Sequence, residues 1–343
     1  MSLGDIEVSL EAVIVAVTDG APRLLTVAGP GGLPALPSGL LEAGDRTLEV
    51  GLRRWVQGQT GLAIGYAEQL YTFGDRVRGL PGQAIGDGEA SEPVDPVVAE
   101  PVPADRGSTG RGGADGISSD SNRRLSIAYL ALVREGMPQQ GASWIDFYDI
   151  FPWEDHRTGR PAVIEEQIVP ALGRFVSADP AQRAARTERV AIVFGTGAVP
   201  FDGVRVLERY ELLYEAGLLH ESGPGRRNGG RDLLDSRPMY LDHRRIAATA
   251  LGRLRGQLSY RPVVFELLPA RFTLLQLQMV VEALAGVRLH KQNFRRLVEG
   301  AGLVEGTGEL TPTGGRPAEL FRFRREVLRE RPRPGVGTPW VRS

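Results

Sequence analysis

The hydrophobic residues in the N-terminal part of the chain fall in short runs that alternate with polar positions, a pattern typical of β-strands. Residues 8–17 and 23–28 are rich in Val, Ile and Leu, and Asp19 and Gly20 between them suit a tight turn. Residues 66–73 and 125–133 have the composition of two further strands. This part of the chain therefore predicts a β-sheet that contains a hairpin.

An amphipathic helix is predicted after the hairpin, beyond a loop rich in Gly and Pro. Leu48, Leu52, Trp55 and Val56 fall on one helical face, and Gly61 follows as a stop signal. Further along, apolar residues recur at helical spacing, which predicts helices over residues 164–176, 204–219 and 243–255. The middle of the chain is thus expected to be helical.

A long interruption separates the strands predicted at residues 66–73 and 125–133. Residues 79–123 are rich in Gly, Ser, Pro and Asp and have almost no aromatic residues. Such a segment cannot bury enough apolar surface to offset the entropy of ordering it. We therefore expect residues 79–123 to form a disordered loop.

After Tyr260 the pattern becomes compact and predicts two helices joined by a tight turn at Gly286. Thr273 is placed to cap the first helix. The core-facing stripe of that helix is Leu274, Leu277, Val280, Val281 and Leu284. The second helix is expected to begin at Leu289, and its buried face is expected to consist of Phe294, Leu297 and Val298.

Basic and amide side chains crowd the first turns and the exposed side of the second helix. They are Lys291, Gln292, Asn293, Arg295 and Arg296. Arg pairs with guanine edges and Asn or Gln with adenine edges, while further cations hold phosphates. Residues 303–324 alternate around a Gly-rich turn, which predicts a two-stranded wing with Arg316 near its tip. The order helix, turn, helix and wing predicts a winged helix-turn-helix DNA-binding domain, with a solvated basic helix as the alternative.

Charge is distributed unevenly along the chain. Residues 255–343 hold 15 Lys and Arg against 8 Asp and Glu, a net charge of +7, whereas residues 1–254 hold 26 against 34, a net charge of -8. A basic C-terminal part favours a polyanionic partner, since neutralised phosphates supply most of the non-specific affinity for nucleic acid. The alternative is a basic surface that contacts only solvent.

Three C-terminal segments resemble the winged helix of the Nudix-related transcriptional regulators of bacterial NAD metabolism: LLPARFTLLQLQMVVEALAG, NFRRLVEGAGLVE and GGRPAELFRF. The resemblance implies a homodimeric repressor of NAD-related genes that binds a palindromic operator in double-stranded DNA. It also implies an upstream Nudix-like domain that senses a nucleotide effector such as ADP-ribose. The length of residues 151–236 is similar to that of a longer, alphaproteobacterial subgroup.

The segment GLLEAGDRTLEVGLRRWVQGQTGL resembles the Nudix signature, in which helix glutamates hold Mg²⁺ for pyrophosphate hydrolysis. Asp45 and Gly61 fall at or near their expected places, but the paired glutamates become Gln57 and Gly58 or, in a shifted alignment, Gly58 and Gln59. Amides and glycine do not supply the carboxylates that a hard cation needs. We therefore expect no catalytic residues, no metal site and no bound cofactor, and the chain is interpreted as a regulator and not an enzyme.

Several residues are candidates for contact with the nucleotide effector. Arginines pair with diphosphates, and an aromatic ring can stack on adenine. The candidates are Arg53 at the Nudix helix, Arg76, Arg78 and Arg124 near the long loop, and Trp153. For each arginine the alternative is an ordinary surface residue, and for Trp153 it is core packing.

These elements divide the chain into consecutive parts. The expected fold is α+β: a Nudix-like α/β/α sandwich with a mixed sheet, a helical insertion and a C-terminal winged helix-turn-helix. The sequence positions are 1–150 for the Nudix-like sensor, 151–236 for the insertion, 237–259 for the final Nudix helix and connector, 260–332 for the winged helix, and 333–343 for a tail.

Composition narrows the remaining classes of protein. The chain has no cysteine and 4 histidines, which excludes disulfides and argues against zinc sites. No apolar run approaches the roughly 20 residues that cross a bilayer, and the N-terminus does not resemble a signal peptide, so we expect a cytoplasmic protein without a membrane partner. Two other functions stay open at this point, a Nudix-type pyrophosphohydrolase acting on ADP-ribose or NADH-like substrates and an adaptor for an acidic protein.

Overall fold

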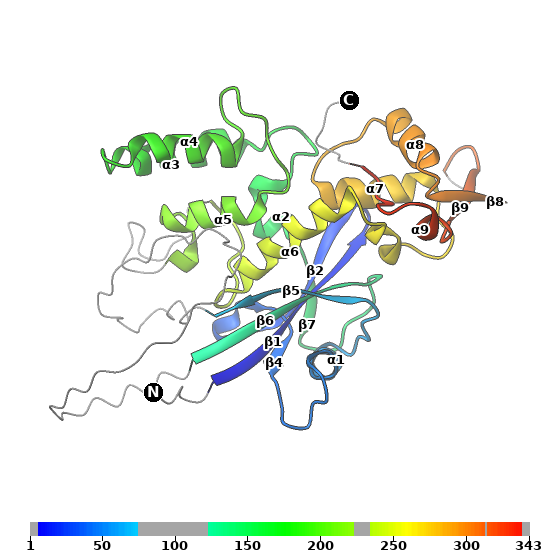
Figure 1. Ribbon diagram of the computed structural model, residues 1–343, viewed down its shortest axis with the longest axis horizontal. Helices are drawn as coiled ribbons and strands as arrows, with labels where there is room; N and C mark the ends of the chain where they lie inside the picture. The colour runs from blue at the N-terminus through cyan, green and yellow to red at the C-terminus, as the bar shows by residue number, and fades with distance from the viewer. Residues whose placement is uncertain (1–5, 75–122, 223–233, 313, 338–343) are drawn as a thin grey trace, which may run out of the picture.

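In the computed structural model, the chain folds as a mixed sheet covered by helices on both faces, with a winged helix at one end (Figure 1). The structure describes residues 6–74, 123–222, 234–312 and 314–337. The expected α+β class is confirmed. The predicted disordered loop at 79–123 lies outside the described residues except for its last residue.

Within the described residues the sheet has seven strands, and β1 (Ile6–Thr18) is at its centre. β1 pairs antiparallel with β2 (Ala21–Ala28) through a turn in which Asp19 and Gly20 have φ of 51° and 73°. This confirms the predicted hairpin. β1 also runs parallel to β6 (Arg123–Leu132), whose other edge pairs with β5 (Ala67–Phe73). Three short strands complete the sheet: β3 (Pro34–Ala35), β4 (Ser38–Leu40) and β7 (Ala142–Asp146).

The two faces of β1 follow from the alternation of its side chains. Leu10, Ala12 and Ile14 face a core shared with α1 (Leu48–Thr60), whereas Val13 and Val15 face the opposite helical layer. α1 is the predicted amphipathic helix. The Thr47 side chain caps its first turn, and Gly61 ends it at a φ of 71° that glycine adopts without strain.

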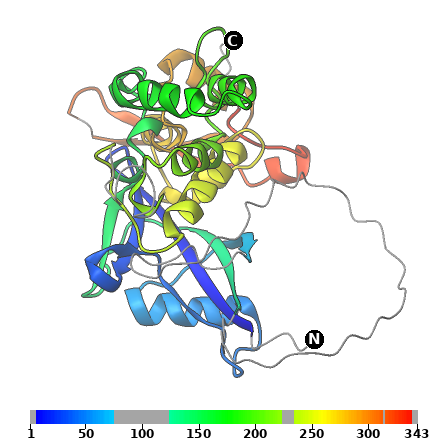
Figure 2. The ribbon, with the colours of Figure 1, turned by 90° about the vertical axis from the view of Figure 1, so that its left-hand side faces the viewer.

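The opposite face of the sheet is covered by α2 (Phe147–Ile150) and α6 (His243–Leu258), with the insertion packed beyond them (Figure 2). The insertion is helical, as predicted. It contains a π-helical turn at Ile164–Ile168, then α3 (Val169–Ser177), α4 (Arg183–Phe194) and α5 (Val206–Glu215). One apolar core runs from this sheet face through α5 and α6 into the winged helix. Short 3₁₀ turns lie at Pro30–Gly32, Pro152–Glu154, His220–Ser222 and Val263–Leu267.

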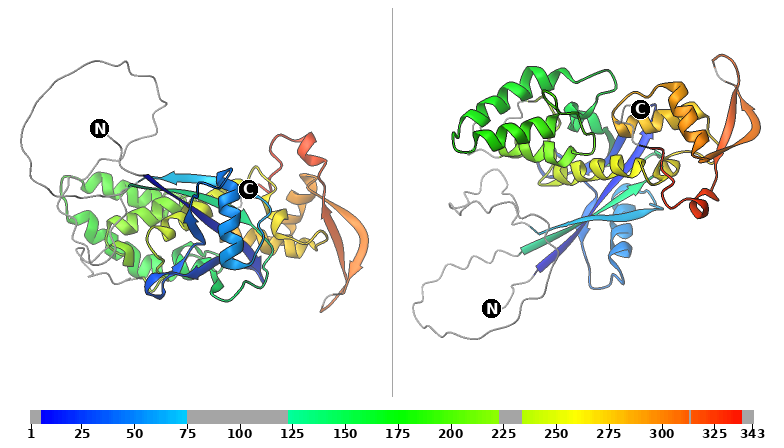
Figure 3. Two further views of the ribbon diagram at one scale, coloured as in Figure 1. Left: turned by 90° about the horizontal axis from the view of Figure 1, so that it is seen from below. Right: turned by 45° about the horizontal axis from the view of Figure 1, so that its top comes forward.

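The winged helix and the insertion lie at opposite ends of the helical layer that covers this face of the sheet (Figure 3). It consists of α7 (Leu274–Ala285), α8 (Lys291–Gly300), β8 (Val304–Thr311), β9 (Ala318–Phe323) and α9 (Val327–Glu330). Thr273 and Gln276 form a capping box at the start of α7, and Gly286 ends it with a φ of 71°. None of the helices within the described ranges has the length and apolar character of a membrane span.

Candidate nucleic-acid interface

The second helix of the winged helix, α8, separates into a buried and an exposed side. Phe294 and Val298, one turn apart, are buried in the core. The prediction that Leu297 belongs to this buried face is wrong, because Leu297 is 42% exposed. Its side chain lies beside Gly337 in the segment that follows α9, which covers part of it. Phe294 and Val298 alone therefore anchor α8 and fix which side faces outward.

All five side chains proposed for base and phosphate contact are exposed on α8. Arg296 donates from Nη2 to Oδ1 of Asn293 across 3.2 Å, and Arg295 lies 3.7 Å from the Glu299 carboxylate. Lys291 and Gln292 occupy the first turn of the helix, directly after the N-cap residue His290. Each amide or guanidinium group thus has a face open to solvent, which is the requirement for reading base edges in a groove.

The wing is a twisted antiparallel pair with an irregularity between Gly306 and Leu310. Its base is tied to the start of α7, where Phe272 and Phe321 exchange two main-chain hydrogen bonds of 3.0 and 2.8 Å. Arg316 is exposed in the turn that joins the two strands, at the place predicted for the tip. Farther from the tip, Arg322 forms an ion pair with Glu305 at 2.6 Å. The wing therefore projects from a fixed base with an arginine at its end.

The region that resembles the Nudix signature has an arginine where a metal ion would need free carboxylates. Arg54 donates from Nη2 to Oδ2 of Asp45 at 2.9 Å and lies 2.9 Å from the Glu42 carboxylate through Nη1. The hydrogen bond from Arg54 holds the pKa of Asp45 below its ordinary value. Gln57 and Gly58 are exposed one turn further along α1. These residues do not fit a divalent cation, because Arg54 neutralises Asp45 and Glu42, and Glu49 on α1 forms an ion pair with Arg53.

The proposed effector residues that the structure describes do not lie together in one site. Arg53 lies on α1, where it pairs with Glu49 and donates to the carbonyl of Gly65. Trp153 lies on the other side of the sheet and is completely buried, with its ring against Phe151. A ring without an exposed face cannot stack on a base, so the expectation for Trp153 is corrected to core packing. The backbone of Arg124 lies opposite that of Glu7 in the β1–β6 ladder, and Arg76 and Arg78 lie outside the described residues.

Sequence reasoning missed a buried ionic cluster between the sensor, the insertion and the winged helix. Glu154, Arg209 and Arg255 have no exposed surface, and both arginines bind the Glu154 carboxylate. The three residues come from positions far apart in the chain, and arginine-rich helices are ordinarily exposed. Only the weak apolar pattern around Arg209 and Arg255, with each arginine on a face otherwise apolar, gave a signal for this cluster.

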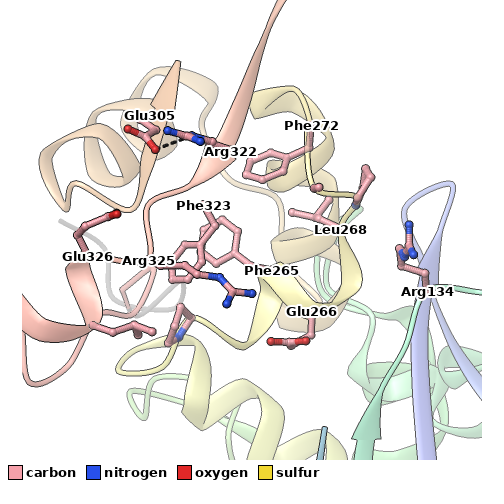
Figure 4. A pocket seen from close by; sticks show the side chains of 14 residues that line it. Arg134, Phe265, Glu266, Leu268, Phe272, Glu305, Arg322, Phe323, Arg325 and Glu326 are labelled. Carbon is pink, nitrogen blue, oxygen red and sulfur yellow. Dashed lines mark ion pairs between the residues drawn. The ribbon is translucent and has the colours of Figure 1, made fainter. Parts of the chain in front are cut away.

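A cleft with a volume of about 790 Å³ lies on the other side of this junction, between the base of the wing and the sensor (Figure 4). Phe265, Phe272 and Phe323 form its apolar wall. Arg134, from the segment after β6, faces it from the sensor, and Arg325 faces it from the segment after β9. Neither guanidinium group takes part in an ion pair among the described residues.

Comparisons with known proteins agree with this architecture. Residues 264–323 match the family model of the NrtR DNA-binding winged helix domain. The ADPR responsive transcriptional repressor NtrR of Acinetobacter baylyi is 38% identical over 83 residues, which are 24% of this chain and 33% of that protein. The matched segment thus spans about one third of the length of that relative.

Two solved structures share the whole fold. The Shewanella oneidensis NrtR bound to a 27mer DNA has a TM-score of 0.51 at 18% identity, and the match covers 93% of this chain and 94% of that chain. A MutT/nudix family protein from Enterococcus faecalis has a TM-score of 0.50 at 12% identity, covering 94% and 88%. The protein is thus of the class that joins a Nudix-like domain to a winged helix. Its winged helix is of the NrtR type, which confirms the resemblance inferred from the sequence.

Proposed function

We propose that the protein is a transcriptional repressor of NAD-related genes whose affinity for operator DNA is controlled by ADP-ribose or a similar nucleotide. The observation that carries the proposal is the exposed face of α8, where amide and guanidinium groups project from a helix anchored by Phe294 and Val298. This helix belongs to the segment that matches the NrtR winged helix family.

The DNA contacts follow from the chemistry of the exposed groups. Asn293 and Arg296 are the residues for base edges, because Asn forms paired hydrogen bonds with adenine and Arg with guanine. Lys291, Gln292 and Arg295 bind phosphates or adjacent edges and set the position of the helix in the major groove. Arg316 at the tip of the wing enters the neighbouring minor groove.

The protein acts as a homodimer on a palindromic operator. One winged helix of this size reads a single half-site and buries too little DNA surface for high specificity. Two copies related by a twofold axis read two half-sites separated by about one turn of DNA. The geometry of the proposed dimer therefore predicts the spacing between the two half-sites.

The N-terminal domain binds the nucleotide effector without hydrolysing it. Support for the effector comes from the A. baylyi relative, whose name describes a repressor responsive to ADPR. Support for the lack of hydrolysis comes from Arg54, which occupies the carboxylates of Glu42 and Asp45. A metal-dependent pyrophosphohydrolase needs those groups, or the glutamates replaced by Gln57 and Gly58, to hold its cation. The same geometry disfavours the alternative of an active hydrolase.

Footprinting of the DNA upstream of the protein's own gene tests this proposal. The full chain is expected to protect two related half-sites whose centres lie about one helical turn apart. Arg174→Ala, on the exposed side of α3, removes one positive charge away from the winged helix. This control variant should give the same footprint as the unmodified protein. Uniform weak protection of all DNA would show charge attraction alone and would contradict the proposal.

A further inference from the structure

Three hydrogen bonds from residues outside the winged helix hold the C-terminal end of α7. Tyr148 donates from its hydroxyl to the carbonyl of Ala283 at 2.6 Å, and Arg255 donates from Nε to the carbonyl of Leu284 at 3.1 Å. The backbone amide of His156 donates to the carbonyl of Gly286 at 2.7 Å. The last carbonyls of a helix have no partner within it, so two side chains and one backbone amide here act as its caps. α8 begins five residues after Gly286.

Arg255 is itself held in place by a buried acid. Its Nη1 atom contacts Oε2 of Glu154 at 2.5 Å, and its Nη2 atom donates to the main-chain carbonyl of Glu154 at 3.0 Å. Arg209, from α5 of the insertion, binds the same carboxylate in bidentate fashion at 2.5 and 3.0 Å. Charges with no exposed surface are tolerated only when they are paired and hydrogen-bonded, so the three side chains have one available arrangement.

The contact between the winged helix and the sensor is uneven. On the side of α2 and α6, the buried cluster and the capped end of α7 join the two parts closely. On the side of the wing, the cleft of about 790 Å³ separates Arg325 from Arg134 (Figure 4). The winged helix is held along one side and separated from the sensor by the cleft along the other, so the direction in which it can turn is toward or away from the sensor across the cleft.

We propose that Tyr148, Glu154 and Arg255 are positioning residues that set the orientation of α8 relative to the sensor sheet. In this arrangement the insertion contributes Arg209, which fixes Glu154 and through it Arg255. The inference rests on the proposed function in that α8 reads DNA, and it extends that function by giving the insertion a role. A conformational change in the sensor then alters the orientation of α8 through the contacts at the end of α7.

Distance measurement between two spin labels tests this orientation directly. The chain has no cysteine, so Gln57→Cys on α1 and Glu299→Cys on α8 place one label on each part at exposed positions. The doubly labelled protein is then compared with the same protein carrying Tyr148→Phe, which removes a single hydroxyl. Tyr210→Phe is the matched control, because Tyr210 is a fully buried tyrosine whose hydroxyl has no hydrogen-bond partner among the described residues.

We expect one narrow distance distribution in the labelled parent and in Tyr210→Phe, and a shifted or broadened one in Tyr148→Phe. Identical distributions in all three proteins would overturn the proposal. Operator affinity should fall about fivefold in Tyr148→Phe, the fold-change that corresponds to one buried hydrogen bond. The label distances are measured without DNA or nucleotide. The distances therefore do not depend on whether the protein binds an operator. If the proposed function is wrong, the parent protein does not bind operator DNA, and the label distances still test the orientation of α8.

The contribution of the insertion has its own pair of variants. Arg209→Lys keeps the charge but cannot make the bidentate contact with Glu154. Arg189→Lys is the control within the insertion, since the ion pair of Arg189 with Glu215 is exposed. We expect Arg209→Lys to shift or broaden the distribution and Arg189→Lys to leave it unchanged. A distribution for Arg209→Lys equal to that of Arg189→Lys would remove the insertion from the proposal.

Discussion

Asn293 and Arg296 are hydrogen-bonded to each other on the exposed face of α8, with 3.2 Å between Oδ1 of Asn293 and Nη2 of Arg296. The pair spans one helical turn and fixes the relative orientation of an amide and a guanidinium group before any DNA is bound. Both groups are suited to bidentate contact with bases. This pair is therefore the centre of the proposed sequence readout.

Replacing either member of this pair should relax sequence specificity. We expect Asn293→Ala and Arg296→Ala each to weaken operator binding by about 1–3 kcal/mol, the discrimination that one bidentate base contact supplies. Binding to unrelated DNA should change much less. Fluorescence anisotropy with operator and shuffled duplexes measures both quantities, and Arg174→Ala, away from α8, is the charge-matched control for Arg296→Ala. An equal loss on both duplexes would assign the two residues to phosphate contact instead.

Arg316 at the tip of the wing is expected to behave differently. Its contact is electrostatic, so Arg316→Ala should weaken binding to all sequences by a similar factor. The slope of log affinity against log salt concentration should fall in magnitude by about 1, since one fewer counterion is released. A titration series in salt tests this. If the slope matches that of Arg174→Ala, the wing does not contact DNA.

The sensor is predicted to be inactive as a hydrolase. Because Arg54 neutralises Asp45 and Glu42, addition of Mg²⁺ or Mn²⁺ with ADP-ribose or NADH should release no AMP above the rate in buffer. Chromatographic separation of AMP from the substrate detects such turnover. Activity that is present in the unmodified chain and lost in Asp45→Ala would show a working metal site and contradict this account.

Stability should depend on pH through His243. Its Nδ1 atom accepts a hydrogen bond from the amide of Leu36 at 2.9 Å, and burial lowers its pKa to about 4. An unfolded histidine has a pKa of about 6.5, so between these values the unfolded chain binds a proton that the folded chain does not. The contribution is fully present above pH 6.5 and is lost as the pH falls toward 4.

His243→Asn keeps an acceptor for Leu36 but does not titrate, which isolates this contribution. Between pH 7.5 and pH 5.0 the free energy of unfolding of the unmodified protein should fall by about 2 kcal/mol more than that of the variant. Denaturant titrations at the two pH values measure the difference. The same pH dependence in both proteins would show that His243 is not the group responsible.

The periodicity of the sequence predicted the elements that rest on a clear apolar stripe. The hairpin at Asp19 and Gly20, the helix ended by Gly61 and the helix capped by Thr273 all lie where their patterns placed them. In each case the local signal, a turn or a cap, agrees with the face that tertiary packing buries. α8 begins at Lys291 and not at Leu289 because His290 is its N-cap residue.

Features that depend on long-range packing were not predictable in this way. α4 was missed because its first two turns hold few apolar residues, with Val193 and Phe194 buried only at its end. Leu297 was assigned to the core because it adjoins Val298, yet the helix turns it outward. The pairing of Glu154 with Arg209 joins residues 55 positions apart. The apolar faces around Arg209 and Arg255 give only a weak signal of burial, and no local pattern identifies Glu154 as their partner.

The central claim is that the winged helix reads a specific operator under the control of a nucleotide sensor. The most direct measurement is the affinity of the full chain for its own upstream operator, with and without ADP-ribose, beside a shuffled duplex of equal length. We predict tight binding to the operator alone and a roughly 5- to 150-fold loss of that affinity with ADP-ribose, the usual range of allosteric coupling. Equal affinity for the two duplexes, or an operator affinity that ADP-ribose does not change, would contradict the account.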